Sequence, residues 1–121
     1  MEGKINHGDI YYAELDGNIG SEQGGFRPVI CIQCEQLNRK SPTVVVVPIT
    51  TKEKQKQITH YYVPKGTGGL LHDSCILTEQ IRTIDKSRLK EYVGTMPPAM
   101  MKQIYKTVRY LIKGTDKKHK K

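Results

Sequence analysis

The feature that most constrains the fold is a run of four consecutive valines, Val44–Val47, inside the stretch from Thr43 to Thr51. β-Branched side chains favour an extended backbone, so the run predicts a strand. Pro48 donates no backbone hydrogen bond, and we expect it at a bulge or an unpaired position. Alternation divides the strand into two faces, one with Val44, Val46 and Thr50, the other with Val45, Val47, Ile49 and Thr51. If the first face meets a cleft at the strand end, the hydroxyl of Thr50 lies there.

The rest of the chain predicts short strands, turns and one helix. Apolar and aromatic runs indicate strands at 10–15, 29–32, 59–63, 75–84 and 92–95, with Pro28 at the start of the second. Residues 35–42 are polar and predict a connection, whereas Asp85 is placed to cap a single helical turn. A helix should open at Met96-Pro97-Pro98 and end at Gly114. Its helically spaced apolar residues, expected to pack on the sheet, are Met101, Ile104, Val108 and Leu111. The predicted fold is mainly β (α+β), a small antiparallel barrel crossed by an amphipathic C-terminal helix.

Length and charge limit the function further. A chain of 121 residues makes one domain, which we expect at 1–114, followed by a basic, disordered tail at 115–121. The formal net charge of +8 favours polyanionic partners: nucleic acid, an acidic protein segment or an anionic membrane. The chain has no apolar run long enough for a transmembrane helix and no secretory h-region, so we expect a cytoplasmic protein without membrane association.

The three cysteines do not form a disulfide framework. Cys31 and Cys34 have Cys-x-x-Cys spacing, but no second such pair and no histidine pair completes a tetrahedral zinc site. We therefore interpret them as structural thiols, and we expect neither a metal nor a cofactor.

The stretch from Gly20 to Pro28 joins two predicted strands and carries unusual chemistry for a turn. It contains three glycines, which allow close approach of backbone to a ligand, together with Glu22, Gln23 and Arg27. A solvated turn is the plain alternative. The stretch from Glu79 to Leu89, rich in polar and charged residues, and the valine strand both favour a functional site instead.

Four motifs in order resemble the MazF/PemK family of toxin endoribonucleases. They are Gly8-Asp9-Ile10-Tyr11, Gly20-Ser21-Glu22-Gln23 with Arg27-Pro28, the strand ending at Thr50, and Glu79-Gln80-Ile81-Arg82-Thr83-Ile84-Asp85. Together they span residues 8 to about 112. The resemblance implies an SH3-like barrel, usually a homodimer, that cleaves single-stranded mRNA at specific sequences without the ribosome. It also implies a MazE-like antitoxin whose acidic segment blocks the RNA groove.

Metal-free RNA cleavage needs a deprotonated 2′-hydroxyl, stabilisation of charge on the phosphorane and a proton for the 5′-oxygen. The guanidinium of Arg27 suits the phosphate, and the hydroxyl of Thr50 can donate to a phosphoryl oxygen. The resemblance implies that these two residues form the catalytic pair, with Glu22 a candidate general base. Some relatives have a histidine where this chain has Ser21, so the identity of the base stays open.

Recognition of splayed bases needs donors, acceptors and an aromatic ring. The candidates for RNA binding are Ser21, Gln23, Phe26, Thr51, Asp73, Ser74, Glu79, Gln80 and Arg82. Arg82 could instead contact phosphate or hold Asp85 in the fold. Two other functions remain open: a basic barrel that binds nucleic acid or an acidic peptide without catalysis, and a topoisomerase-poisoning toxin on the same fold.

Overall fold

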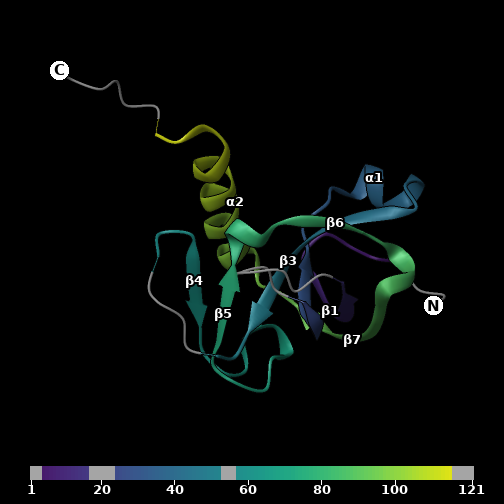
Figure 1. Cartoon of the computed structure of the whole chain (residues 1–121), viewed down its shortest axis with the longest axis horizontal. Helices are drawn as coiled ribbons and strands as arrows, with labels where there is room; N and C mark the ends of the chain where they lie inside the picture. Colours follow the sequence, from purple (N-terminus) through teal and green to yellow (C-terminus); the bar gives the residue numbers. More distant parts are fainter. Residues whose placement is uncertain (1–3, 17–23, 53–56, 116–121) are drawn as a thin grey trace.

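The computed structural model describes residues 4–16, 24–52 and 57–115, and its core is one antiparallel sheet (Figure 1). The strands are β1 (Asp9–Leu15), β2 (Gly25–Cys31), β3 (Thr43–Thr50), β4 (His60–Val63), β5 (Ser74–Leu77), β6 (Arg82–Asp85) and β7 (Leu89–Thr95). Their order is β4-β5-β3-β2-β1-β7, and β6 also pairs with β3. The mainly β fold with a C-terminal helix is confirmed, but the strand pairings leave the sheet open, so it is barrel-like rather than a closed barrel.

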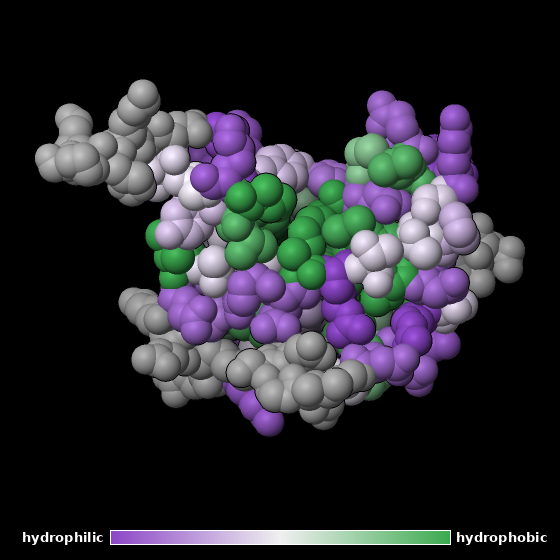
Figure 2. Space-filling model, turned by 45° about the horizontal axis from the view of Figure 1, so that its top comes forward, coloured by the Kyte–Doolittle hydropathy of each residue, from purple (hydrophilic) through white to green (hydrophobic). Residues whose placement is uncertain are grey.

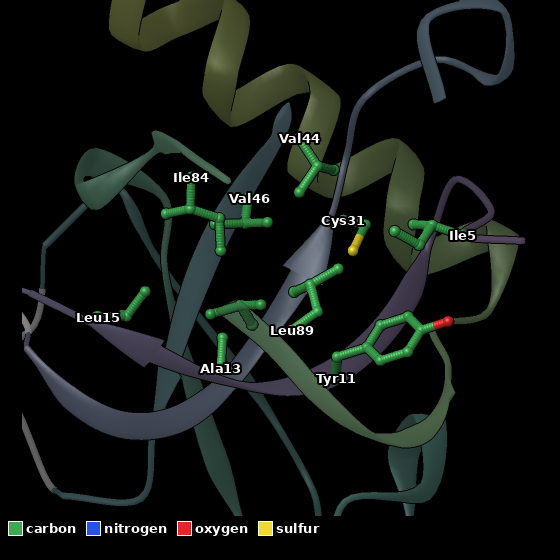
Figure 3. Packing of buried hydrophobic residues seen from close by; sticks show 10 residues of the cluster. Ile5, Tyr11, Ala13, Leu15, Cys31, Val44, Val46, Ile84 and Leu89 are labelled. Carbon is green, nitrogen blue, oxygen red and sulfur yellow. The ribbon is translucent and has the colours of Figure 1, made fainter. Parts of the chain in front are cut away.

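Buried side chains form two clusters, one on each face of this curved sheet. We call the first the barrel core; it contains Ile5, Tyr11, Ala13, Leu15, Val29, Cys31, Val44, Val46, Ile84 and Leu89 (Figure 3). The second, the helix-side core, contains Ile10, Ile30, Val47, Ile49, Val63, Leu70, Ile76, Met96, Met101 and Ile104. Val44 and Val46 lie in the first and Val47 and Ile49 in the second, as the alternation predicts.

Helix α2 (Pro98–Lys113) begins with a proline in its first turn and ends at Gly114, as predicted. Met101 and Ile104 are buried in the helix-side core, and Val108 packs against it partly buried. Leu111 was also expected to pack on the sheet, but it is 36% exposed. The last turn, which also carries the exposed Ile112, therefore presents apolar surface to its surroundings.

A short helix replaces the irregular connection predicted at 35–42. Helix α1 spans Glu35–Lys40, with Cys34 at its N-cap. Three hydrogen bonds hold it in place: Gln33 Nε2 donates to Asn38 Oδ1 at 3.1 Å and to the Thr43 carbonyl at 3.0 Å, and Asn38 Nδ2 donates to the Gln33 carbonyl at 3.1 Å. These bonds satisfy the buried polar pair Gln33 and Asn38, which helix propensity alone does not reveal.

The strand predicted at 75–84 is interrupted. The 3₁₀ turn η2 (Thr78–Gln80) separates β5, which pairs with the end of β3, from β6, which pairs with its beginning. On that edge of β3 the pairing stops at Val46 and resumes at Ile49, so Pro48 lies in the gap, as expected for a residue without a backbone donor.

The predicted position of Pro28 is wrong, whereas the predicted capping role of Asp85 is confirmed. Pro28 lies inside β2 rather than at its start, because β2 pairs with β1 from Gly25 but with β3 only from Val29. The edge of β2 that faces β3 is thus unpaired at Pro28. Asp85 caps the turn η3 (Lys86–Arg88) as predicted, and its Oδ1 accepts a hydrogen bond from the Ser87 amide at 2.8 Å.

Almost all of the predicted tail, 115–121, lies outside the described residues. Cys31 is buried at the end of β2, whereas Cys34 is exposed beyond that strand, and both are free thiols with Cys75. No helix in the described part of the chain is long and apolar enough to cross a membrane.

Candidate functional site

Arg27 and Thr50, which are far apart in sequence, lie on the same face of neighbouring strands. The register of β2 and β3 pairs Val29 with Pro48 and Cys31 with Val46. Arg27 and Thr50 each lie two residues beyond the Val29–Pro48 pair, so alternation puts both on the face of that pair. Arg27 also pairs with Ala13 of β1, a residue of the barrel core, so its side chain is on the barrel-core side. The two predicted catalytic side chains are therefore directed toward one end of the barrel core.

The guanidinium of Arg27 is oriented by the backbone beside it. Its Nε donates to the Gly24 carbonyl at 2.9 Å. This bond fixes the plane of the guanidinium against the backbone just before β2. No carboxylate of the described residues forms an ion pair with it. Partial burial lowers the pKa of Arg27 from its usual value, yet arginine remains charged at any pH near neutrality. An oriented, partly desolvated cation of this kind binds phosphate well.

Thr50 is the last residue of β3, and its hydroxyl already accepts one hydrogen bond. Thr50 Oγ1 accepts a hydrogen bond from the Lys52 amide at 3.2 Å, so its own hydrogen remains to be donated. The residue is 3% exposed, and it pairs with Cys75 of β5. Cys75 in turn pairs with Tyr62 of β4. Thr50, Cys75 and Tyr62 thus form a row across three strands.

A pocket of about 620 Å³ opens at the end of this row. Three predicted RNA-binding residues, Thr51, Asp73 and Ser74, line it. The other lining residues include Lys52 and Tyr62, and Tyr62 was not predicted to bind RNA. Tyr62 is 42% exposed and supplies an aromatic ring for base stacking. The sequence signal was the pair Tyr61-Tyr62 in a strand, where alternation exposes one of the two rings.

Two acidic or amide candidates lie in η2, outside this pocket. Glu79 accepts a hydrogen bond from Thr59 Oγ1 at 2.9 Å and is 3.0 Å from His60 Nε2. The His60 side chain is 4% exposed, and its Nδ1 is buried without a hydrogen-bond partner among the described residues. The Glu79 carboxylate is therefore held by Thr59 and by His60 at the start of β4, and Gln80 follows it in the same turn.

Arg82 and Phe26 lie on opposite faces of the sheet. Arg82 pairs with Val46 of the barrel core, so it shares the face of Arg27, and its NH2 donates to the Asp16 carbonyl at 3.2 Å. Phe26 is 57% exposed and stacks on Tyr12, with ring centroids 5.2 Å apart. As the neighbour of Arg27 along the strand, Phe26 faces away from it. The structure does not bring this aromatic ring to the catalytic pair.

The other three predicted residues, Ser21, Glu22 and Gln23, lie outside the described residues. In the described part of the chain, no group of three or more His, Cys, Asp or Glu side chains is arranged to hold a metal ion. The site that the structure describes thus combines the Arg27 guanidinium and the Thr50 hydroxyl on one face with a neighbouring pocket that Lys52 and Tyr62 help to line.

Comparisons with known proteins match this chain to one toxin family and to endoribonucleases. The family model of PemK-like, MazF-like toxins of type II toxin–antitoxin systems matches residues 6–112. Endoribonuclease EndoA of Bacillus subtilis is 45% identical over 101 residues, which cover 83% of this chain and 87% of that protein. Endoribonuclease MazF of Staphylococcus saprophyticus is 46% identical over 101 residues, covering 83% and 84%.

Solved structures of toxins and endoribonucleases are similar to this chain in fold. A crystal structure of MazF from Deinococcus radiodurans superposes with a TM-score of 0.78 at 20% identity, over 92% of this chain and 98% of that chain. A mycobacterial endoribonuclease, solved in complex with its cognate antitoxin, gives a TM-score of 0.71 at 22% identity, over 89% and 94%. From its sequence and its fold, this chain belongs to the PemK-like, MazF-like toxin family of type II toxin–antitoxin systems.

Proposed function

We propose that this protein is an endoribonuclease that cuts single-stranded mRNA at a specific sequence and serves as the toxin of a toxin–antitoxin pair. Two relatives that are nearly half identical over most of the chain are named endoribonucleases. The observation that carries the proposal is the pairing of Val29 with Pro48, because it puts Arg27 and Thr50, two residues away on each strand, on one face. A partner antitoxin follows from the family, and the net charge of +8 suits an acidic antitoxin segment.

The proposed reaction is an internal transfer at the phosphate. The 2′-oxygen of the ribose forms a bond to phosphorus, the bond from phosphorus to the 5′-oxygen breaks, and the products are a 2′,3′-cyclic phosphate and a 5′-hydroxyl. A base takes the 2′-proton, and an acid supplies a proton to the leaving oxygen. Arg27 stabilises the growing negative charge, and the Thr50 hydroxyl donates to a phosphoryl oxygen. Glu22 is our candidate for the base, and metal is not required by any of these steps.

Substrate binding in this proposal involves a local rearrangement and the neighbouring pocket. Thr50 is nearly inaccessible, so side chains around the strand end must shift before a phosphate reaches its hydroxyl. Bases next to the cut phosphate enter the pocket of Thr51, Asp73 and Ser74, where Tyr62 provides stacking. Glu79, Gln80 and Arg82 extend the contact surface beyond the pocket, and Ser21 and Gln23 contribute from the preceding loop. Phe26 can contact only RNA that continues around the opposite face.

The test is cleavage of a long single-stranded RNA in EDTA, with the ends mapped by primer extension. We expect discrete cuts that leave 5′-hydroxyl ends. Removing the guanidinium in Arg27→Ala, or only the hydroxyl in the nearly isosteric Thr50→Val, should slow cleavage by about 10²–10³-fold. Lys102→Ala, which removes a charge from the exposed side of α2, is the matched control.

The outcomes separate the proposal from its competitors. Full cleavage by both variants would remove Arg27 and Thr50 from the mechanism. RNA binding without any cut would support a non-catalytic binding module, and gyrase inhibition without RNA cleavage would support a topoisomerase poison. Cuts that appear only when a divalent ion is added would contradict the metal-free mechanism.

A further inference from the structure

A second, strongly basic pocket lies away from the candidate active site. It has a volume of about 820 Å³ and is built from the N-terminal arm, α1, η3 and β7. Its lining residues are Lys4, Ile5, Asn38, Arg39, Lys86, Ser87, Leu89 and Lys90. Half of these residues are cationic and none is acidic.

The pocket is at the opposite end of β3 from Thr50. The amide of Lys86 donates to the Pro42 carbonyl at 3.0 Å, directly before β3 begins at Thr43. A strand of this length spans about 23 Å from Thr43 to Thr50. Ile5 and Leu89, which belong to the barrel core, are among the lining residues. The two pockets therefore open near different ends of the molecule and do not share a ligand phosphate.

Two of the lysines are positioned by backbone carbonyls rather than by carboxylates. Lys86 Nζ donates to the Asn38 carbonyl, and Lys90 Nζ donates to the Ser87 carbonyl at 3.2 Å. Asn38 is itself buried and held by its hydrogen bonds to Gln33. A carbonyl orients an ammonium group but leaves its full charge in place. These cations are thus arranged before any ligand arrives, which lowers the cost of binding.

Nearby acidic residues neutralise little of this charge. Arg39 forms an ion pair with Glu35 at 3.4 Å, and both side chains are nearly half exposed, so the pair is weak. Asp85 accepts the Ser87 amide as the cap of η3. Within the described ranges, no carboxylate forms an ion pair with Lys4, Lys86 or Lys90. The concave surface therefore keeps most of its positive charge.

We propose that this pocket binds an oligophosphate, meaning two or more adjacent phosphates, either in a free polyphosphate or along a nucleic-acid backbone. Lysine ammonium groups and the exposed Arg39 match closely spaced phosphate charges, and the Ser87 hydroxyl adds a neutral donor. A compact anion of several charges uses all four cations at once, which a single carboxylate cannot do. The inference concerns binding alone and stands whether or not the chain cuts RNA.

The test compares two double variants that change the net charge equally. Lys4→Glu/Lys90→Glu reverses two pocket charges but keeps Lys86, which ties η3 to α1. Lys102→Glu/Lys106→Glu reverses two exposed charges on α2 and is the control. The probes are inorganic tripolyphosphate, followed by calorimetry, and labelled single-stranded DNA in a short and a long form, followed by fluorescence anisotropy. DNA lacks the 2′-hydroxyl, so binding is measured without cleavage.

We expect the pocket variant to bind at least one probe about fivefold more weakly than the control variant, and to lower the slope of log affinity against log salt by about one or more. Loss of tripolyphosphate binding identifies a site for a free oligophosphate. An effect on long DNA alone identifies a backbone subsite. Equal weakening in both variants, or no change with either probe, overturns the proposal. Selective loss of binding to a polyglutamate peptide, with both phosphate probes unaffected, overturns it in favour of a protein partner.

Discussion

At the scale of single residues, several side chains in the family motifs maintain the fold rather than face a substrate. Asp9 is buried, and its Oδ2 accepts the Asn6 amide at 3.0 Å while its Oδ1 accepts the Thr95 hydroxyl at 2.9 Å. It therefore joins the N-terminal arm to the end of β7. His60 similarly supports Glu79 from a buried position. Arg27 and Thr50, by contrast, combine a motif position with a shared face and a phosphate-compatible group.

The buried thiol of Cys31 makes the free energy of unfolding depend on pH in the alkaline range. Burial, with a smaller contribution from Asp9, raises the pKa of Cys31 to about 12. In the unfolded chain the thiol ionises near pH ~8.5. Between these values the unfolded state binds fewer protons, so the free energy of unfolding falls as pH rises, by up to about 1.4 kcal/mol per pH unit.

We expect Cys31→Ala to be less stable at neutral pH but to lose stability less steeply above pH ~9 than the unsubstituted protein. Urea unfolding across that pH range measures the slope. Cys34→Ala, at an exposed thiol, is the control and should retain the original slope. An unchanged slope in Cys31→Ala would show that the alkaline sensitivity arises elsewhere.

At the scale of elements, β7 and the turn η1 (Thr67–Gly69) approach each other more closely than side chains allow. A Cβ on Gly94 would lie 2.2 Å from the carbonyl oxygen of Gly68 and 2.8 Å from its carbon. Both are backbone atoms, so no side chain can rotate away. The contact joins the edge of the sheet to the loop between β4 and β5.

Gly94→Ala should therefore force β7 and η1 apart and destabilise the protein by about 3 kcal/mol. Gly66→Ala tests backbone strain alone, because Gly66 has φ of +94° and a Cβ added there would meet nothing within 4 Å; we expect a cost of about 1 kcal/mol there. Thermal and urea unfolding give both values. Equal effects in the two variants would mean that the close contact relaxes without cost.

At the scale of the whole molecule, apolar surface remains uncovered beside α2. Figure 2 shows apolar side chains gathered between the C-terminal helix and α1. The last two turns of α2 contribute exposed apolar residues, Tyr110, Leu111 and Ile112, the last 73% exposed. The homodimer implied by the family would cover such a surface.

We expect Leu111→Glu/Ile112→Glu to shift the protein from dimer to monomer at concentrations where the unsubstituted chain is dimeric, because the new charges would be buried without partners. Light scattering coupled to gel filtration measures the mass. Lys102→Glu/Lys106→Glu, on the exposed polar side of the same helix, should leave the mass unchanged. A stable dimer in the apolar-face variant would place the interface elsewhere.

Local patterns in the sequence determined several strands, turns and helix ends of this protein. The valine run predicts β3 and its two faces, Asp85 predicts the cap of η3, and proline and glycine mark the ends of α2, because strand propensity, capping and helix termination act within a few residues. The tertiary structure decided what depends on distant partners. Pairing with two parts of β3 divides 75–84, and the pairing of β2 with β3 puts Arg27 and Thr50 on one face. The four cations of the second pocket come from separate segments, so no sequence window could reveal them.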